Sequence, residues 1–226
     1  MRSERQTFSA FVFDFDGTLI DSRPAIEKAA QLAIAAVLPA HQGRCVTDVI
    51  GPPIRIMFRR IIGNCDEDTL ERLVAAFRVA YDGGVCLETP LYAGVSEVLL
   101  RIASQGGTNY ILTNKPWGPT CRILTHLGIR SHVREIVTPD SREHPFASKT
   151  EGLCNLLKRQ RLAASDVLMI GDSPDDAEAS EACGVAFAAA VYGYGGLDKA
   201  SNRKNWLIIE SPQDILIHLS LKDKDP

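Results

Sequence analysis

The chain has 226 residues, of which 45% are hydrophobic and 23% charged, and its formal net charge is -3. This composition is ordinary for a folded globular protein and excludes an intrinsically disordered one. The small negative charge provides no broad basic surface, so a nucleic-acid polymer is not expected as a partner. The longest apolar stretches, at 32–39 and 185–191, are too short to span a bilayer, and residues 1–7 do not resemble a signal peptide. We therefore expect a cytoplasmic protein without a membrane partner.

The cysteines and histidines provide no metal-site pattern. There is no CxxC pair, and no cysteine has a histidine at the spacing of a metal site. We therefore predict reduced thiols, as in other cytoplasmic proteins. The five histidines are equally scattered, so a histidine-centred mechanism is not supported. The six cysteines are Cys45, Cys65, Cys86, Cys121, Cys154 and Cys183.

Short apolar runs rich in β-forming residues recur along the chain and predict strands. The predicted strands are 8–15, 109–113, 133–138, 166–171, 185–191 and 206–210. Between most of them the apolar residues follow helical spacing, at 95–104, 121–127, 151–157 and, after the last strand, 212–221. Alternation of strands and helices predicts an α/β fold with a mostly parallel sheet and helices on both faces.

One segment, residues 22–87, departs from this alternation. It has helical patterns at 25–38, 54–62 and 66–81, and no convincing strand. The sequence therefore predicts two domains, a core made of residues 1–21 and 88–226 and a helical domain of residues 22–87.

Two acids end the first predicted strand. Asp14 and Asp16 are two residues apart, so both side chains point to the same side of the strand. Burial of two carboxylates together is unfavourable unless a cation or a shared proton compensates them. Capping or turn aspartates explain such a pair equally well.

Asp172 follows the predicted strand 166–171. The next residues, Ser173 and Pro174, suit a helix N-cap and the first helical position. Asp175 and Asp176 would then lie in the first turn, where the helix dipole favours negative charge. Capping explains Asp175 well and Asp172 less well.

A third strand, 109–113, ends at the run Thr-Asn-Lys-Pro of residues 113–116, which suits an anion site or a simple N-cap. Ligands of open parallel sheets bind at the carboxyl ends of the strands, where Asp14, Thr113 and Asp172 should converge. Lys149, which opens another predicted helix, is either a member of this site or a solvated lysine. Carboxylates beside a phosphate suit Mg²⁺.

These residues resemble the motifs of the haloacid dehalogenase superfamily of phosphohydrolases, within it the phosphoglycolate phosphatase-like branch. Residues 14–22, 112–116 and 170–176 are similar to the first, second and fourth motifs, and the helical insert lies where this branch has its cap. At the third motif many members have Lys-Pro-x-Pro, whereas residues 147–151 have the lysine without the prolines. Lys149 is the choice there, and Lys158 is the second candidate.

The resemblance implies a Rossmann-like three-layer core with a small helical cap, and a Mg²⁺-dependent phosphatase for small phosphate monoesters. Asp14 would be the nucleophile that forms an aspartyl-phosphate, and Asp16 the general acid and base. Mg²⁺ would be held by Asp14, the backbone carbonyl of Asp16 and Asp172. Asp176 would orient the waters of the metal.

The resemblance also implies the remaining contacts of the substrate. Thr113, Asn114 and Lys149 would bind the phosphoryl oxygens. The cap would exclude water and read the substrate, with Arg55 as the nominated residue. The partner would be a small-molecule phosphate ester, and the enzyme a monomer or a homodimer.

Four alternatives accompany this interpretation. A phosphomutase of the β-phosphoglucomutase type shares the fold and the phospho-aspartate. A phosphonate hydrolase needs a cap lysine for a Schiff base, and Lys28 is the only lysine of residues 22–87. A haloacid dehalogenase does not need the acid/base group that Asp16 supplies. A non-catalytic binding protein would be expected to have lost one or more of these acids.

Overall fold

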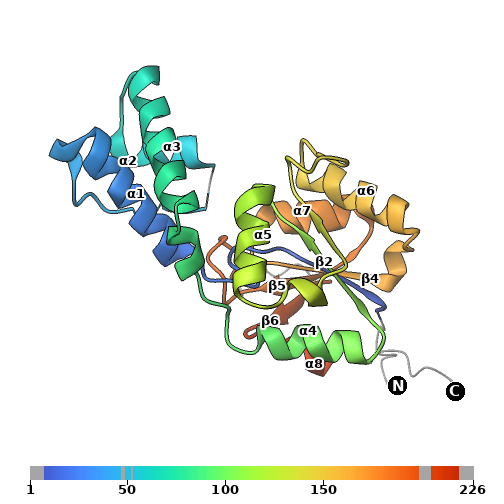
Figure 1. Cartoon of the computed structure of the whole chain (residues 1–226). Coiled ribbons are helices and arrows are strands. Elements are labelled where there is room, and N and C mark those ends of the chain that lie inside the picture. The colour runs from blue at the N-terminus through green and yellow to red at the C-terminus, as the bar shows by residue number, and fades with distance from the viewer. Residues whose placement is uncertain (1–7, 47–48, 52, 199–204, 219–226) are drawn as a thin grey trace, which may run out of the picture. The chain divides into compact units, whose positions relative to one another are not determined.

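The computed structural model describes residues 8–46, 49–51, 53–198 and 205–218. The chain divides into two compact units. One unit combines Met1–Asp21 with Leu91–Pro226, and the other is Ser22–Pro90. The first contains the sheet, and the second is helical (Figure 1).

The sheet of the first unit has six strands, and every pairing between neighbours is parallel. This confirms the predicted α/β fold with its mostly parallel sheet. The strand order is β3-β2-β1-β4-β5-β6. The strands are β1 (Ala10–Phe13), β2 (Thr108–Leu112), β3 (Glu135–Val137), β4 (Val167–Gly171), β5 (Ala186–Ala190) and β6 (Leu207–Ile209).

Helices cover both faces of this sheet. In Figure 1, α6 and α7 lie on one side of it, and α4 and α8 on the other. The side chains between the sheet and α6 and α7 form one apolar cluster, with Val12, Met169 and Leu153 among its buried members. The helices are α4 (Val95–Ser104), α5 (Trp117–His126), α6 (Lys149–Gln160), α7 (Pro174–Cys183) and α8 (Asp214–His218); residues 219–221 of the predicted last helix lie outside the described residues.

The second unit has three main helices, α1 (Arg23–Val37), α2 (Ile54–Ile62) and α3 (Glu67–Asp82). They enclose an apolar core of their own, in which Ile34, Phe58 and Leu70 are fully buried. Among the described residues of the whole chain, no helix is long and apolar enough to cross a membrane.

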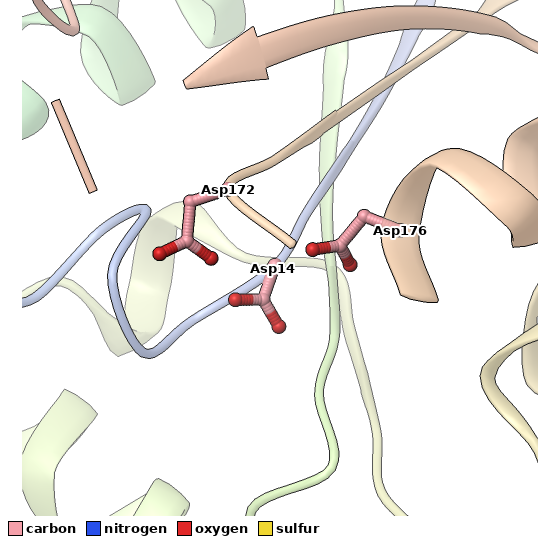
Figure 2. A group of neighbouring side chains, drawn as sticks. All are labelled: Asp14, Asp172 and Asp176. Carbon is pink, nitrogen blue, oxygen red and sulfur yellow. The ribbon is translucent and has the colours of Figure 1, made fainter. Parts of the chain in front are cut away.

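The order of the strands determines where a ligand can bind. From β1 the chain runs outward to β2 and β3, and it then returns to β4 on the other side of β1. Such a reversal leaves a crevice at the carboxyl ends of the strands on either side of it. Asp14 directly follows β1 and Asp172 directly follows β4, and the pairing of Phe13 with Ile170 places the two acids within one residue of the same level at this edge of the sheet (Figure 2).

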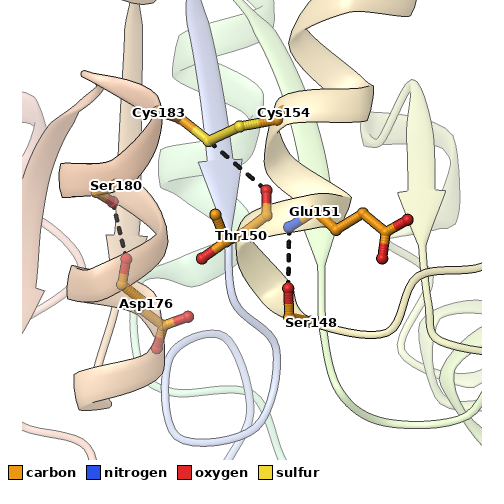
Figure 3. Close-up of a disulfide and its surroundings, with 7 residues drawn as sticks. All are labelled: Ser148, Thr150, Glu151, Cys154, Asp176, Ser180 and Cys183. Carbon is orange, nitrogen blue, oxygen red and sulfur yellow. Dashed lines mark hydrogen bonds between the residues drawn. A yellow bond between two sulfur atoms is a disulfide. The ribbon is translucent and has the colours of Figure 1, made fainter.

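A disulfide joins α6 to α7. It links Cys154 to Cys183 across a sequence separation of 29 residues (Figure 3). The prediction of reduced thiols is therefore wrong for these two cysteines. Their Cα atoms lie 5.9 Å apart because the two helices pack side by side, and no sequence spacing reports that distance. The cysteines consequently give no argument for a reducing compartment.

We predict that Cys154→Ser lowers the free energy of unfolding of the first unit. Closure of a loop of this size removes about 3–4 kcal/mol of chain entropy from the unfolded state. The melting temperature should fall on the order of 10 °C, as measured by thermal denaturation.

Cys121→Ser, a change of the same kind on α5 at a cysteine outside the disulfide, should have a much smaller effect. Dithiothreitol should bring the wild type to the level of Cys154→Ser and leave that variant unchanged. Equal melting temperatures of the wild type with and without the reductant would contradict the prediction.

Candidate active site

Three acidic side chains meet at the carboxyl ends of β1 and β4. Asp14, Asp172 and Asp176 are all buried, and each offers a carboxylate oxygen that lies within 4.8 Å of the other two (Figure 2). The sheet brings the first two together, and the first turn of α7 adds the third. Hard oxygen donors of this kind suit Mg²⁺.

Lys149 is the positive partner of two of these acids. Its Nζ lies 2.6 Å from Oδ1 of Asp14 and 2.5 Å from Oδ1 of Asp176. Burial alone would lower the pKa of Lys149, but the two carboxylates outweigh burial and raise this pKa well above its ordinary value. The structure therefore places Lys149 inside the acidic cluster and not in solvent, as the first residue of α6 after the N-cap Ser148.

One lysine does not balance three acids. Burial raises the pKa of Asp14 well above its ordinary value; Lys149 opposes this shift, and the two other carboxylates add to it. Burial and the neighbouring Asp176 raise the pKa of Asp172 to about 7. Among the described residues, neither Oδ2 of Asp14 nor Oδ1 of Asp172 accepts a hydrogen bond. The cluster thus has an excess of negative charge and two oxygens available, which is what a divalent cation requires.

The loop after β5 holds Asp172 in place. The backbone N–H groups of Tyr194 and Gly195 donate to Oδ2 of Asp172, at 2.9 and 2.7 Å. A Cβ atom on Gly17 or Gly193 would collide with the Asp172 side chain, and the backbone of Gly17 has φ +86°, which favours glycine. Glycine at positions 17 and 193 is therefore needed for the close approach of the backbone to the Asp172 carboxylate.

Asp176 has two roles at once. Its Oδ2 accepts hydrogen bonds from the backbone N–H of Ser173 at 3.1 Å and from the Ser173 hydroxyl at 2.6 Å. Ser173 is the N-cap of α7 and Pro174 lies in its first turn, as predicted. The other oxygen of Asp176 faces Lys149. Helix capping and the acidic cluster therefore use opposite oxygens of one side chain.

Asp16 is half-buried and forms an ion pair with Lys115, which was not among the sequence-predicted site residues. The Lys115 Nζ lies 2.8 Å from Oδ1 and 3.2 Å from Oδ2 of Asp16. The signal for Lys115 was its place in the run 113–116, two residues after Thr113. A lysine in a loop after a strand is usually solvated, so the sequence alone gave no reason to single it out.

The two polar residues predicted after β2 differ in exposure. Thr113 is buried, and its Oγ1 accepts a hydrogen bond from the backbone N–H of Lys115 at 3.1 Å. Asn114 is exposed, and its side-chain amide lies 3.4 Å from Oδ2 of Asp175. Both follow β2 at the edge of the sheet that carries Asp14. Lys158, the second candidate for the third motif, lies on the exposed surface near the end of α6 and away from the N-terminal turn of Lys149.

The two residues nominated in the helical insert lie in the second unit, each with acidic partners there. Arg55 on α2 forms ion pairs with Glu67 at 2.6 Å and with Glu71 at 3.5 Å. Lys28 on α1 donates to both oxygens of Glu88, at 2.6 and 2.8 Å.

Comparisons with known proteins agree with the geometry. Residues 11–190 match the family model described as haloacid dehalogenase-like hydrolase. A 5'-nucleotidase of Pseudomonas aeruginosa is 30% identical over 203 residues, which cover 88% of this chain and 90% of that protein. A solved structure from Haemophilus somnus, described as a predicted phosphoglycolate phosphatase, has a TM-score of 0.80 at 25% identity and covers 93% of this chain and 97% of that one.

A third relative has a different name. The tyrosine-protein kinase PtkA of Mycobacterium tuberculosis is 28% identical over 189 residues, or 83% of this chain. This chain covers only 63% of the length of that kinase. The family model, by contrast, matches well over half of this chain and includes Asp14, Thr113, Lys149 and Asp172. The chain therefore belongs to the haloacid dehalogenase-like hydrolase family.

Proposed function

We propose that this protein is a Mg²⁺-dependent phosphatase that hydrolyses small phosphate monoesters through an aspartyl-phosphate on Asp14. The observation that carries the proposal is a buried carboxylate at the end of β1, with a lysine on one oxygen and no hydrogen bond to the other among the described residues. The names of the relatives, a 5'-nucleotidase and a predicted phosphoglycolate phosphatase, support a phosphate ester as substrate.

The raised pKa of Asp14 indicates that the site needs more positive charge to keep this carboxylate ionised. A protonated carboxyl group is a poor nucleophile, so Asp14 must be kept ionised in its buried position. Lys149 supplies one positive charge within 2.6 Å. Asp14, Asp172 and the backbone carbonyl of Asp16 would hold Mg²⁺, which would add positive charge and screen the repulsion between carboxylate and phosphate.

Each remaining residue has a role in the proposed reaction. Asp14 attacks phosphorus in line with the leaving oxygen. Asp16 gives that oxygen its proton and then takes a proton from the water that hydrolyses the aspartyl-phosphate. Thr113, Asn114 and Lys149 bind the phosphoryl oxygens, where the negative charge of the transition state lies. Asp176 contacts Lys149 and would orient the waters of a bound metal.

The helical unit is proposed to act as the cap that selects the substrate. Arg55 would contact substrate only if it exchanged its ion pairs with Glu67 and Glu71 for new ones. Lys28 donates to both oxygens of Glu88 and its side chain is 52% exposed, whereas a Schiff-base lysine is activated in a desolvated pocket, so a phosphonate hydrolase is disfavoured. An assay with a sugar 1-phosphate distinguishes a phosphatase from the alternative, a phosphomutase. The proposed phosphatase should yield free phosphate and not an isomeric sugar phosphate.

We expect Asp14→Asn to abolish hydrolysis of an aryl phosphate. The amide cannot form the aspartyl-phosphate, so kcat/KM should fall by about 10⁴-fold or more. Release of inorganic phosphate measures the effect, and circular dichroism checks that the variant is folded.

The matched control is Asp166→Asn, the same substitution at the residue that precedes the amino end of β4. It should keep near-normal activity, because it lies at the opposite end of the strand from Asp172. Near-normal turnover by Asp14→Asn would reject Asp14 as the nucleophile.

The stability of the metal-free protein should depend on pH through Asp172. Its pKa is about 7 in the folded protein and 3.8 in its ordinary state. Between these values the folded state binds more protons than the unfolded state, so the free energy of unfolding falls as the pH rises from 3.8 to about 7. Mg²⁺ favours the ionised form and should therefore raise the melting temperature more above pH 7 than near pH 5.

Asp172→Asn should make the pH dependence shallower and reduce the stabilisation by Mg²⁺. Thermal denaturation with EDTA and with Mg²⁺ measures both effects without an activity assay. An equal response of the wild type and the variant to Mg²⁺ would remove Asp172 from the proposed metal site.

A further inference from the structure

Lys115 is a buried cation that the proposed mechanism does not use. Its side chain is only 6% exposed, whereas that of its partner Asp16 is 24% exposed. The backbone N–H of Lys115 donates to Oγ1 of Thr113, which holds the turn after β2 in place. The lysine thus reaches Asp16 from the loop after the neighbouring strand β2, across 99 residues of sequence.

The geometry of this pair constrains the carboxylate of Asp16. One ammonium group contacts both oxygens, at 2.8 and 3.2 Å, so rotation of the carboxylate would break one of the two contacts. Asp16 lies in the turn that follows β1, directly before Gly17 with its φ of +86°. The contact with Lys115 therefore restricts the rotation of a carboxylate that lies beyond the end of the strand. Each carboxylate oxygen has a second lone pair, so proton exchange on Asp16 is compatible with the contact.

Each of the two lysines at this edge of the sheet contacts a carboxylate. Lys149 faces Asp14 and Asp176, and Lys115 faces Asp16. Burial of a second lysine is unfavourable unless its charge is compensated, and Asp16 provides that compensation.

We propose that Lys115 is the positioning residue of Asp16: it orients the carboxylate towards the leaving oxygen of the ester. The inference rests on the proposed phosphatase function. It assigns Lys115 to the departure of the leaving group, whereas Lys149 serves the nucleophile and the phosphoryl oxygens. A misoriented Asp16 delivers its proton less well, which matters only when the leaving oxygen is basic enough to need one.

The test compares aryl phosphates whose leaving groups differ in basicity, from 2,4-dinitrophenyl through 4-nitrophenyl to phenyl phosphate. The quantity measured is kcat/KM, which reports the steps up to departure of the phenol and excludes later hydrolysis of the aspartyl-phosphate. Lys115→Met removes the charge and keeps the length of the side chain. It should lower kcat/KM for phenyl phosphate by about 100-fold and for dinitrophenyl phosphate far less, because general acid catalysis contributes about 10²–10⁴-fold only where a proton is needed.

Three variants distinguish this role from a structural one. Lys115→Arg keeps the charge and should recover part of the phenyl phosphate rate. Lys149→Met should lower kcat/KM for all three esters by similar factors, since Lys149 does not act on the leaving group. In an Asp16→Asn background, Lys115→Met should have little further effect, because the residue through which it acts is already neutralised.

The outcomes separate the inference from the function on which it rests. A wild type that releases no phosphate from any ester overturns the phosphatase function, and the role of Lys115 with it. An active wild type with equal losses for all three esters in Lys115→Met overturns the role of Lys115 alone. A full additional loss in the Asp16→Asn background would do the same, since Lys115 would then act without Asp16.

Discussion

Asp14, Asp172 and Asp176 place three acidic side chains in a buried space, where one oxygen of each lies within 4.8 Å of the others. Like charges so close together in a medium of low dielectric repel one another strongly. The elements around them provide compensation: a lysine from α6, amides from the loop after β5 and the N-terminal turn of α7. The raised pKa values of Asp14 and Asp172 show that this compensation is incomplete. In the proposed reaction, a bound cation would supply the positive charge that the acidic cluster lacks, and the phosphate ester would add negative charge beside it.

The fold makes this concentration of charge possible at low conformational cost. β1 lies between β2 and β4, so the residues that follow three parallel strands meet at one edge. The strands themselves are largely buried and mostly apolar, and the polar residues of the site begin where the strands end. The site is thus carried by the buried strands of the sheet, and catalysis by positioned charges requires such a support.

Helix α6 carries the lysine that faces the acidic cluster, helix α7 carries one of the three acids, and a disulfide joins the two helices. Lys149 opens α6 and Asp176 lies in the first turn of α7, while Cys154 and Cys183 join the same two helices further along. Packing between α6 and α7 therefore keeps Lys149 of α6 close to Asp176 of α7. Within the second unit, Arg55 and Lys28 have acidic partners of their own.

The amino-acid sequence by itself determined the elements and the edge at which the acids lie. Apolar runs with strand and helix spacing are local signals, and Asp14, Thr113 and Asp172 directly follow three such runs. The N-cap Ser173 and the first-turn residue Pro174 were predicted for the same reason, because capping involves only neighbours in sequence.

Only the tertiary structure decided which groups pair. Lys149 is 135 residues from Asp14, Lys115 is 99 residues from Asp16, and Cys154 is 29 residues from Cys183. Nothing in the local pattern distinguishes such lysines from solvated ones, or such cysteines from reduced thiols, because burial and partner are properties of packing between elements. The residues that supply the chemistry, Lys149 among them, were therefore visible in the sequence, whereas the ion pairs of Lys149 and Lys115 became visible only once the strands and helices had been brought together.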